Sequence, residues 1–340
     1  NGSSQPIDDA LPITVGVSGL NAGQATVSDY SDWTVSMNWS NGTHSFSATA
    51  GIGMPFLYFT KNTTDVASVK IIEGTVVISN EMLVVTNSHQ GADFAVYAPV
   101  GSTWTQTGTA YTSTLNGQNY WSMAYLAPSA PSVAQAANEY KKYAYVFPTN
   151  TTASYTYNES TSKLTTVFNV EAEVKEGLET NVLLGLLPHQ WANLASGSPQ
   201  PSDYNYSSIL GEIKTLDSNT FTVEHTFKGI LPTLPYLDNY SEGFSPALLD
   251  GKIAQIENDG LATWTDSYNE GQVMNRLIQT ARIADEMGNV EARNKIVATI
   301  KERLEDWLKA ESGEVAFLFY YNTNWSTLIG YPAGHGQDNN

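Results

Sequence analysis

The chain has 340 residues with 34 acidic and 16 basic side chains, which gives a formal net charge of −18, and it contains no cysteine. The acidic balance argues against nucleic acid and anionic membranes as partners, because both reward clustered Lys and Arg. The lack of cysteine excludes thiol catalysis, disulfide frameworks and cysteine-ligated zinc. Charged residues are only 15% of the chain, against roughly 25% in an average globular protein. A neutral polar substrate such as a carbohydrate fits a surface with so few charged residues better than nucleic acid or an anionic membrane does.

The start of the sequence and its hydropathy bear on where the protein acts. The chain opens Asn1-Gly2-Ser3-Ser4 without an initiator Met, which predicts that a leader or a tag has been removed or left out. No apolar run approaches the roughly 18 residues of a membrane-spanning helix. We therefore expect a secreted, extracellular protein.

Up to about residue 185 the sequence consists of short β-type runs separated by turn residues. Residues 33–39 alternate apolar and polar side chains with a period of two, as a half-buried strand does. Many such runs with Gly, Asn and Pro between them predict an antiparallel β-sandwich. Residues 133–142 interrupt the pattern and predict a short helix. The other expected strands are residues 44–49, 56–59, 66–72, 75–79, 82–86, 92–98, 120–126, 143–147 and 164–174.

Residues 186–265 give mixed signals and are rich in proline. Residues 221–227 alternate as a further strand, and Pro232 and Pro235 oppose regular structure after it. We interpret this segment as a small α/β connecting domain.

After residue 265 the apolar period changes to 3.6 residues. Ser267 and Glu270 have the spacing of a capping box, Gly288 is placed to end this helix, and Asn289 to cap a second one. Two long helices with almost no loop predict an antiparallel αα-hairpin. The two helices of one hairpin cannot cover each other on both faces, so the segment predicts the start of a helical domain. The expected buried positions are Val273, Leu277, Ala281 and Ala284 on the first helix, and Ile296, Ile300, Leu304, Trp307 and Leu308 on the second.

Motifs for metal, nucleotide or serine chemistry are missing from the sequence. It contains no His-Glu-x-x-His, Gly-x-Gly-x-x-Gly, phosphate-loop or Gly-x-Ser-x-Gly pattern. We therefore expect no metal and no cofactor. Glycoside hydrolysis needs two carboxylates flanking the bond, and no pair stands out. His44 and His89 stand among polar neighbours and receive no role.

Two aromatic segments are candidate binding sites. His189-Gln190-Trp191 follows the apolar run 182–187 and could place a donor and a stacking ring in a cleft, although Trp191 as a core residue is the simpler interpretation. Residues 317–325 interleave aromatic and amide side chains, including Tyr320 and Trp325, and a Gly-rich loop with His335 follows. Aromatic rings can stack on sugar faces while amides bind the hydroxyls, or the segment can be a tightly packed aromatic loop.

Five sequence blocks occur in a fixed order along the chain. They are residues 53–58, 187–191, 227–232, 268–271 with 282–285, and 319–322 with Trp325 and 328–332. In this order they resemble glycoside hydrolase family 81, the endo-β-1,3-glucanases or laminarinases. The resemblance implies an N-terminal β-sandwich, a small α/β domain and a C-terminal (α/α)6 barrel that holds the cleft. It also implies an inverting, metal-free hydrolysis by a carboxylic acid and a carboxylate.

The family's signature segment, Asp-His-His-Phe-His, carries the catalytic acid and is expected just after Asn340, with the catalytic base further along the barrel. The sequence is therefore interpreted as the N-terminal portion of such an enzyme. Residues 1–185 would form the β-sandwich, 186–265 the connecting domain and 266–340 the first helices of the barrel.

Within this portion the expected contacts with β-1,3-glucan are stacking and hydrogen bonding, not proton transfer. The residues expected to make them are Tyr320, Trp325, His335 and Trp191. A second fragment that supplies the rest of the barrel is a partner that this interpretation allows. The alternative is a non-catalytic glucan-binding or scaffold protein that is complete at this length.

Overall fold

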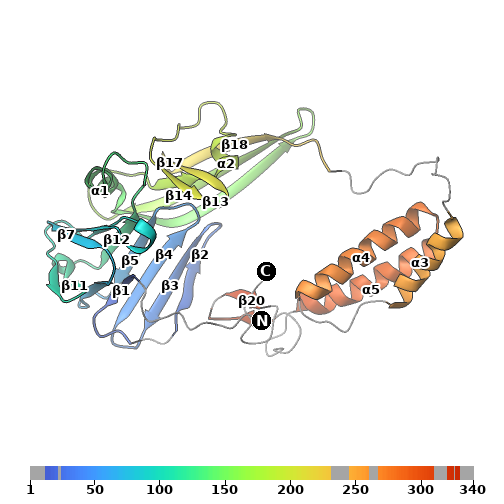
Figure 1. Cartoon of the computed structure of the whole chain (residues 1–340), viewed down its shortest axis with the longest axis horizontal. Coiled ribbons are helices and arrows are strands. Elements are labelled where there is room, and N and C mark those ends of the chain that lie inside the picture. The colour runs from blue at the N-terminus through green and yellow to red at the C-terminus, as the bar shows by residue number, and fades with distance from the viewer. Residues whose placement is uncertain are drawn as a thin grey trace. The chain divides into compact units, whose positions relative to one another are not determined.

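The computed structural model describes residues 12–21, 24–230, 245–259, 267–309, 320–324 and 326–329. The chain divides into two compact units, Asn1–Lys228 and Gly229–Asn340. Antiparallel strands dominate the first unit, and helices make up most of the described part of the second (Figure 1). The expectation of a β-rich N-terminal part followed by helices is confirmed. The domain boundaries expected near residues 185 and 265 stay predictions.

Two antiparallel sheets form a sandwich in the first unit. Buried side chains from both sheets meet in one apolar cluster, which includes Val69 from one sheet and Phe59 and Trp121 from the other. The smaller sheet contains, in spatial order, β1 (Ile13–Val17), β6 (Ala67–Ile71), β11 (Ala110–Ser113) and β10 (Thr105–Thr107). The larger contains β2 (Thr26–Tyr30), β3 (Thr34–Ser40), β4 (Ser45–Gly51), β5 (Phe56–Lys61), β12 (Tyr120–Tyr125), β9 (Phe94–Tyr97), β8 (Met82–Thr86) and β7 (Thr75–Ser79).

The larger sheet is buried on both faces along its central strands. In β5, Phe59 faces the sandwich core, whereas Phe56 and Tyr58 enter a second cluster on the opposite face, as a side-chain period of two requires. The helix α1 (Val133–Tyr140) covers that second face, and Ser132 Oγ caps it by accepting from Gln135 N at 3.2 Å. Short 3-10 turns are η1 (His89–Gly91), η2 (Leu115–Gly117) and η3 (Lys141–Tyr143).

Two three-stranded antiparallel sheets complete the first unit. Their buried side chains share a cluster that includes Val170, Leu184, Leu216 and Phe221. One sheet has the order β13 (Val146–Asn158), β14 (Lys163–Val174), β18 (Thr220–Thr226), and the other has the order β15 (Leu183–Leu186), β17 (Gly211–Asp217), β16 (Asn205–Ser208). The short helix α2 (Pro188–Trp191) follows β15.

The described part of the second unit contains α3 (Pro246–Asp259), α4 (Ser267–Glu286), α5 (Val290–Lys309) and the strand pair β19 (Tyr320–Asn322) and β20 (Thr327–Ile329). Leu277 and Ala281 of α4 pack against Ile296 and Ile300 of α5. The chain reverses at Gly288, which has a φ of +76°, and Asn289 Oδ1 accepts from Ala292 N at 3.2 Å. The predicted αα-hairpin with its Gly stop and Asn cap is confirmed.

Some sequence predictions are wrong in detail. The strand expected at 143–147 begins only at Val146, because the backbone continues from α1 into η3. Leu304 and Leu308 are exposed, not buried. The Trp307 side chain lies outside the described residues.

Candidate functional site

The structure describes only part of the predicted binding set. Trp191 is the last residue of α2, and Tyr320 is the first residue of β19. Of Tyr320 only the backbone is described, and Trp325 and His335 lie outside the described residues. The binding roles predicted for these four residues stay predictions.

Trp191 is held by local structure on two sides. Pro188 opens α2, where its missing N–H costs nothing, and Gln190 Oε1 accepts from Leu187 N at 2.9 Å. The indole N–H of Trp191 donates to Glu212 O at 2.9 Å, and Lys214 Nζ lies 4.1 Å from the ring centroid. The ring also packs against the cluster shared by the two small sheets. Its one hydrogen-bond donor and part of its ring are therefore already engaged.

A pocket opens beside α2 and is lined mostly by apolar and aromatic side chains. Its cavity volume is about 150 Å³. Phe168 and Phe221 stack with ring centroids 4.6 Å apart, and Trp33 meets Phe168 edge-on at 5.7 Å. These are favourable arrangements for aromatic pairs. The lining residues are Asp32, Trp33, Ile52, Gly53, Ala153, Phe168, Leu184, Gly185, Leu187, Gln190 and Phe221.

Two glycines let the backbones approach closely at the wall of this pocket. A Cβ on Gly53 would lie 2.3 Å from Gly185 O, and a Cβ on Gly185 would lie 2.4 Å from Gly53 O. Gly53 also has a φ of +77°, which favours glycine. Gly53 opens the first sequence block, and β15 with Gly185 leads directly into the second at residues 187–191. The structure thus brings these two blocks together.

Hydrogen bonds fix the loop that carries Trp33. Asp32 Oδ2 accepts from Ala153 N at 2.6 Å, and Trp33 N donates to Thr151 Oγ1 at 3.0 Å. Asp32 N also donates to Thr151 O at 3.2 Å. The turn before β3 is thereby tied to β13, so the sandwich and the small sheet contribute walls to one pocket.

The pocket suits binding better than acid–base chemistry. Asp32 is the only carboxylate among its lining residues, whereas glycoside hydrolysis needs two. A second cavity of about 570 Å³ lies beside Trp39, Phe46 and β1, and no carboxylate lines it. Few polar groups among aromatic rings are typical of a small-ligand site.

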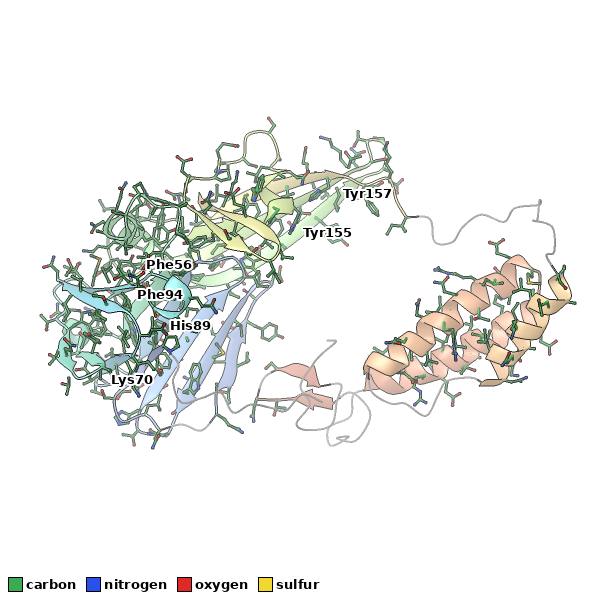
Figure 2. The ribbon with its side chains drawn as sticks, in the orientation of Figure 1. Phe56, Lys70, His89, Phe94, Tyr155 and Tyr157 are labelled. Carbon is green, nitrogen blue, oxygen red and sulfur yellow. The ribbon has the colours of Figure 1, made fainter. Side chains whose placement is uncertain are left out.

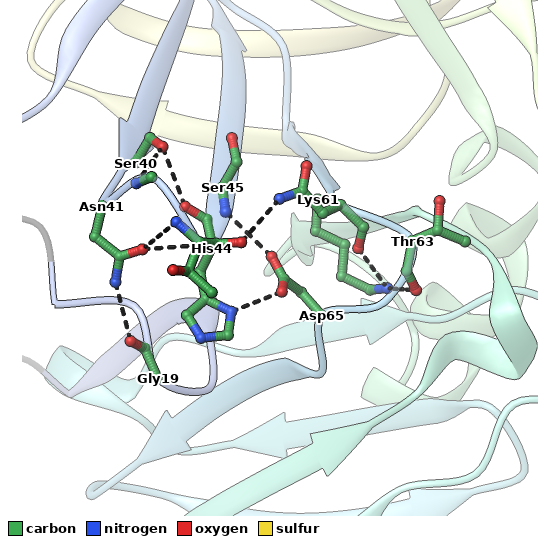
Figure 3. A network of polar contacts seen from close by, with 11 residues as sticks. Gly19, Ser40, Asn41, His44, Ser45, Lys61, Thr63 and Asp65 are labelled. Carbon is green, nitrogen blue, oxygen red and sulfur yellow. Dashed lines mark hydrogen bonds and ion pairs between the residues drawn. The ribbon is translucent and has the colours of Figure 1, made fainter.

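A buried polar network lies at the start of β4 (Figure 3). The Asp65 side chain, 3% exposed, accepts from His44 Nδ1 at 2.6 Å and from Ser45 N at 3.1 Å. Burial acts to raise the pKa of Asp65, but these hydrogen bonds and the charges of His44 and Lys61 outweigh it, so the pKa lies below its usual value. The sequence alone assigns no role to His44, because its partner Asp65 is 21 residues away and no motif joins them.

Lys61 completes this network by binding backbone oxygens. Its Nζ donates to Asn62 O and Thr63 O at 3.3 Å and to Gln118 O at 3.0 Å. Burial lowers the pKa of Lys61, and the charge of Asp65 opposes part of that shift. Such contacts join loops of the sandwich and indicate a structural role.

The described residues lack a metal-binding cluster and a membrane-spanning helix. No group of three or more His, Asp or Glu side chains is arranged to hold a metal ion there. Nor does that part of the chain contain a helix both long and apolar enough to cross a membrane.

Known proteins similar to this chain are carbohydrate-active enzymes. A protein from Thermobifida fusca named glucan endo-1,3-beta-D-glucosidase is 35% identical over 331 residues, 95% of this chain and 41% of that protein. A protein of the same name from Acetivibrio thermocellus is 34% identical over 316 residues, 91% of this chain and 39% of that protein. No family model matches the chain.

A solved structure of a glycoside hydrolase also matches this chain. The structure of a glycoside hydrolase family 81 protein from Clostridium thermocellum matches with a TM-score of 0.70 and 34% identity, covering 96% of this chain and 45% of that one. The class of protein that the fold and these matches resemble is therefore glycoside hydrolase. More particularly, the chain is homologous to glycoside hydrolase family 81 along nearly its whole length, which confirms the resemblance found in the sequence. It spans 41% and 39% of the length of the two curated relatives.

Proposed function

We propose that this protein hydrolyses internal β-1,3-glucosidic bonds of β-1,3-glucan. The observation that carries the proposal is the 35% identity, over 95% of this chain, to a protein named glucan endo-1,3-beta-D-glucosidase. The low share of charged residues, 15% of the chain, and the aromatic pocket agree with an uncharged polysaccharide substrate. The comparisons do not favour the alternative of a non-catalytic scaffold.

The proposed mechanism is an inverting one with two carboxylates outside these 340 residues. Such a mechanism sets an acid and a base roughly 6.5–9.5 Å apart to admit a water. Within the described residues, the two cavities above contain a single carboxylate, Asp32. The helical carboxylates Asp285, Glu286 and Glu302 are exposed. This distribution supports a chain that positions and binds but does not itself supply the acid and base.

The helices are proposed to be the first of an (α/α)6 barrel. On α5 the exposed residues Val290, Val297, Leu304 and Leu308 repeat at intervals of seven and four, so they share one helix face. Ile296 and Ile300, which pack against α4, lie directly beside this stripe, because Ile300 and Leu304 are also four residues apart. The apolar surface of α5 is therefore wider than the part that α4 covers, which fits a helix inside a larger helical layer. Amide exchange in α5 should slow when further helices are present, and unchanged exchange would count against the barrel.

The substrate test is reducing-end release from laminarin and from cellulose by the protein with its full native sequence. We expect hydrolysis of laminarin and none of cellulose, and proton NMR of the first products should show the inverted α-anomer. Preferred hydrolysis of cellulose would overturn the substrate assignment, and a β-anomer would overturn only the mechanism.

Export and a second polypeptide are separate proposals. A surface poor in charge and a chain without cysteine support a secreted protein, and enzyme confined to the cells instead of the medium would contradict it. Intact-mass analysis of the purified native protein tests for a second fragment that supplies the rest of the barrel.

A further inference from the structure

Aromatic side chains continue from the pocket along one face of β13. Ala153 lines the pocket, and Tyr155 and Tyr157 follow it at intervals of two residues, so all three point to the same face. Tyr155 is 75% exposed and Tyr157 is 43% exposed. Figure 2 shows both tyrosines on the β13–β14 hairpin. We call Trp33, Phe168, Phe221, Tyr155 and Tyr157 the aromatic strip.

The register places the pocket and the tyrosines on one continuous surface. Ala153 pairs with Phe168, Tyr155 with Thr166, and Tyr157 with Leu164, and directly paired residues share a face. From Ala153 to Tyr157 the strip runs about 13 Å at roughly 3.3 Å per residue. That length exceeds one pyranose ring.

Apart from Asp32 at the pocket, the strand residues described above place no carboxylate or ammonium group on this face, although the chain is strongly acidic. On β14 the charged residues Lys163, Glu171 and Glu173 alternate with Leu164, Thr166 and Phe168 and therefore lie on the opposite face. Lys163 pairs there with Glu224 at 2.8 Å. At the pocket, Asp32 Oδ2 is engaged by a backbone N–H. A face with a single, hydrogen-bonded carboxylate on a chain of charge −18 fits an uncharged ligand.

The strip is also held in place before any ligand arrives. The Tyr157 hydroxyl donates to Phe227 O at 2.9 Å, and the two rings meet edge-on at 6.2 Å. Trp33 is fixed through Thr151 and Phe168. The cavity of about 150 Å³ is as large as one that binds a benzene ring. Pre-organised rings cost little entropy on binding.

We propose that the aromatic strip is a non-catalytic binding site for a neutral β-glucan chain, with one sugar ring in the pocket and the next against Tyr155. The choice of β-1,3-linked glucose rests on the proposed function. The aromatic strip itself would supply neither the acid nor the base, and it would hold polymer on the β-rich unit.

The test is calorimetric titration of the 340-residue chain with laminarihexaose. Tyr155→Ala should raise the Kd roughly two- to tenfold, since an aromatic contact is worth about 0.5–1.5 kcal/mol beyond its area. Tyr155→Phe should bind nearly as wild type, because it keeps the ring. Val77→Ala on β7, at the opposite edge of the larger sheet from β2, is an exposed apolar control and should leave the Kd unchanged.

Two results would overturn the site: no binding of laminarihexaose by the wild-type chain, or equal affinities for wild type, Y155A and V77A. Laminarin hydrolysis by the full-length protein is measured separately. If the full-length protein hydrolyses laminarin but Y155A does not weaken binding, the proposed binding site is refuted and the proposed activity stands. If binding depends on Tyr155 but laminarin is not hydrolysed, the proposed activity is refuted and the proposed binding site stands.

Discussion

The carboxylate of Asp65 joins the start of β4 to the loop before β6 through His44 and Ser45. Asp65→Asn keeps the shape of the side chain but removes its charge and one of its acceptor oxygens. We expect the free energy of unfolding of the β-rich unit to fall by about 1–3 kcal/mol at pH 7. Urea unfolding followed by tryptophan fluorescence measures this, with the exposed Asp203→Asn as the control.

The stability difference between wild type and the same variant, D65N, should depend on pH. The pKa of Asp65 is lower in the folded chain than in the unfolded one, where it is about 3.9. The contribution of Asp65 to the free energy of unfolding is therefore fully present above the pKa of the unfolded chain. It is lost as the pH falls through the pKa of the folded chain. The difference between wild type and D65N should shrink below about pH 4. A difference that stays constant from pH 7 to pH 3 would contradict this account of the network.

Gly53 tests the close backbone approach at the pocket wall. Gly53→Ala adds a Cβ at 2.3 Å from Gly185 O in a left-handed conformation, and should cost about 2–4 kcal/mol. Gly42 has a similar φ of +86° but nothing within 4 Å of the added Cβ, so G42A should cost only about 1 kcal/mol. Thermal unfolding separates the two, and equal losses would show that the contact with Gly185 does not matter.

At the scale of elements, a buried ion pair joins the two long helices. Glu270 is fully buried in the first turn of α4, and Arg303 Nε of α5 lies 2.8 Å from its Oε1. Arg303→Met should destabilise the helical unit by about 3 kcal/mol, because it removes one partner of a buried pair. Circular dichroism at 222 nm during thermal unfolding measures the loss.

A matched control exists on the same helix. Arg293 pairs with Asp285 at 2.6 Å on the surface, and such pairs contribute at most about 1 kcal/mol. R293M should therefore have a much smaller effect than R303M. Similar losses in the two variants would contradict the importance of burial.

The elements predicted correctly are those with a strong apolar period. Residues 75–79 and 82–86 are short runs rich in β-branched residues and form β7 and β8, and the Gly288–Asn289 stop and cap lie where the sequence places them. The long hairpin of β13 and β14 was only partly predicted, because much of β13 is polar and exposed on both faces. Helix α3 was missed, since Gly251 weakens its helical pattern.

The remaining errors arise from contacts distant in sequence. On α5 the apolar stripe is wider than the part that α4 covers, and periodicity alone does not show where the contact ends, so the burial predicted for Leu304 and Leu308 is wrong. The pocket was not predicted either. Its walls come from Trp33, Gly53, Phe168 and Gly185, which only the sheet register brings together. Of the predicted binding residues, Trp191 lies next to this pocket at the end of α2.

At the scale of the whole molecule, the β-rich unit and the helices have separate parts in the proposed function. The first unit carries the aromatic pocket, and the helices carry an apolar face that fits further helices. The homology covers nearly all of this chain but less than half of each relative. We therefore propose that these residues bind glucan and that residues outside them cleave the bond.

The most direct test of this division compares reducing-end release from laminarin by the 340-residue chain and by the full native polypeptide. We expect the full polypeptide to hydrolyse laminarin and the 340-residue chain to release no reducing ends while still binding laminarihexaose. Hydrolysis of laminarin by the 340-residue chain alone would contradict the account, because it would place the acid and the base within these residues.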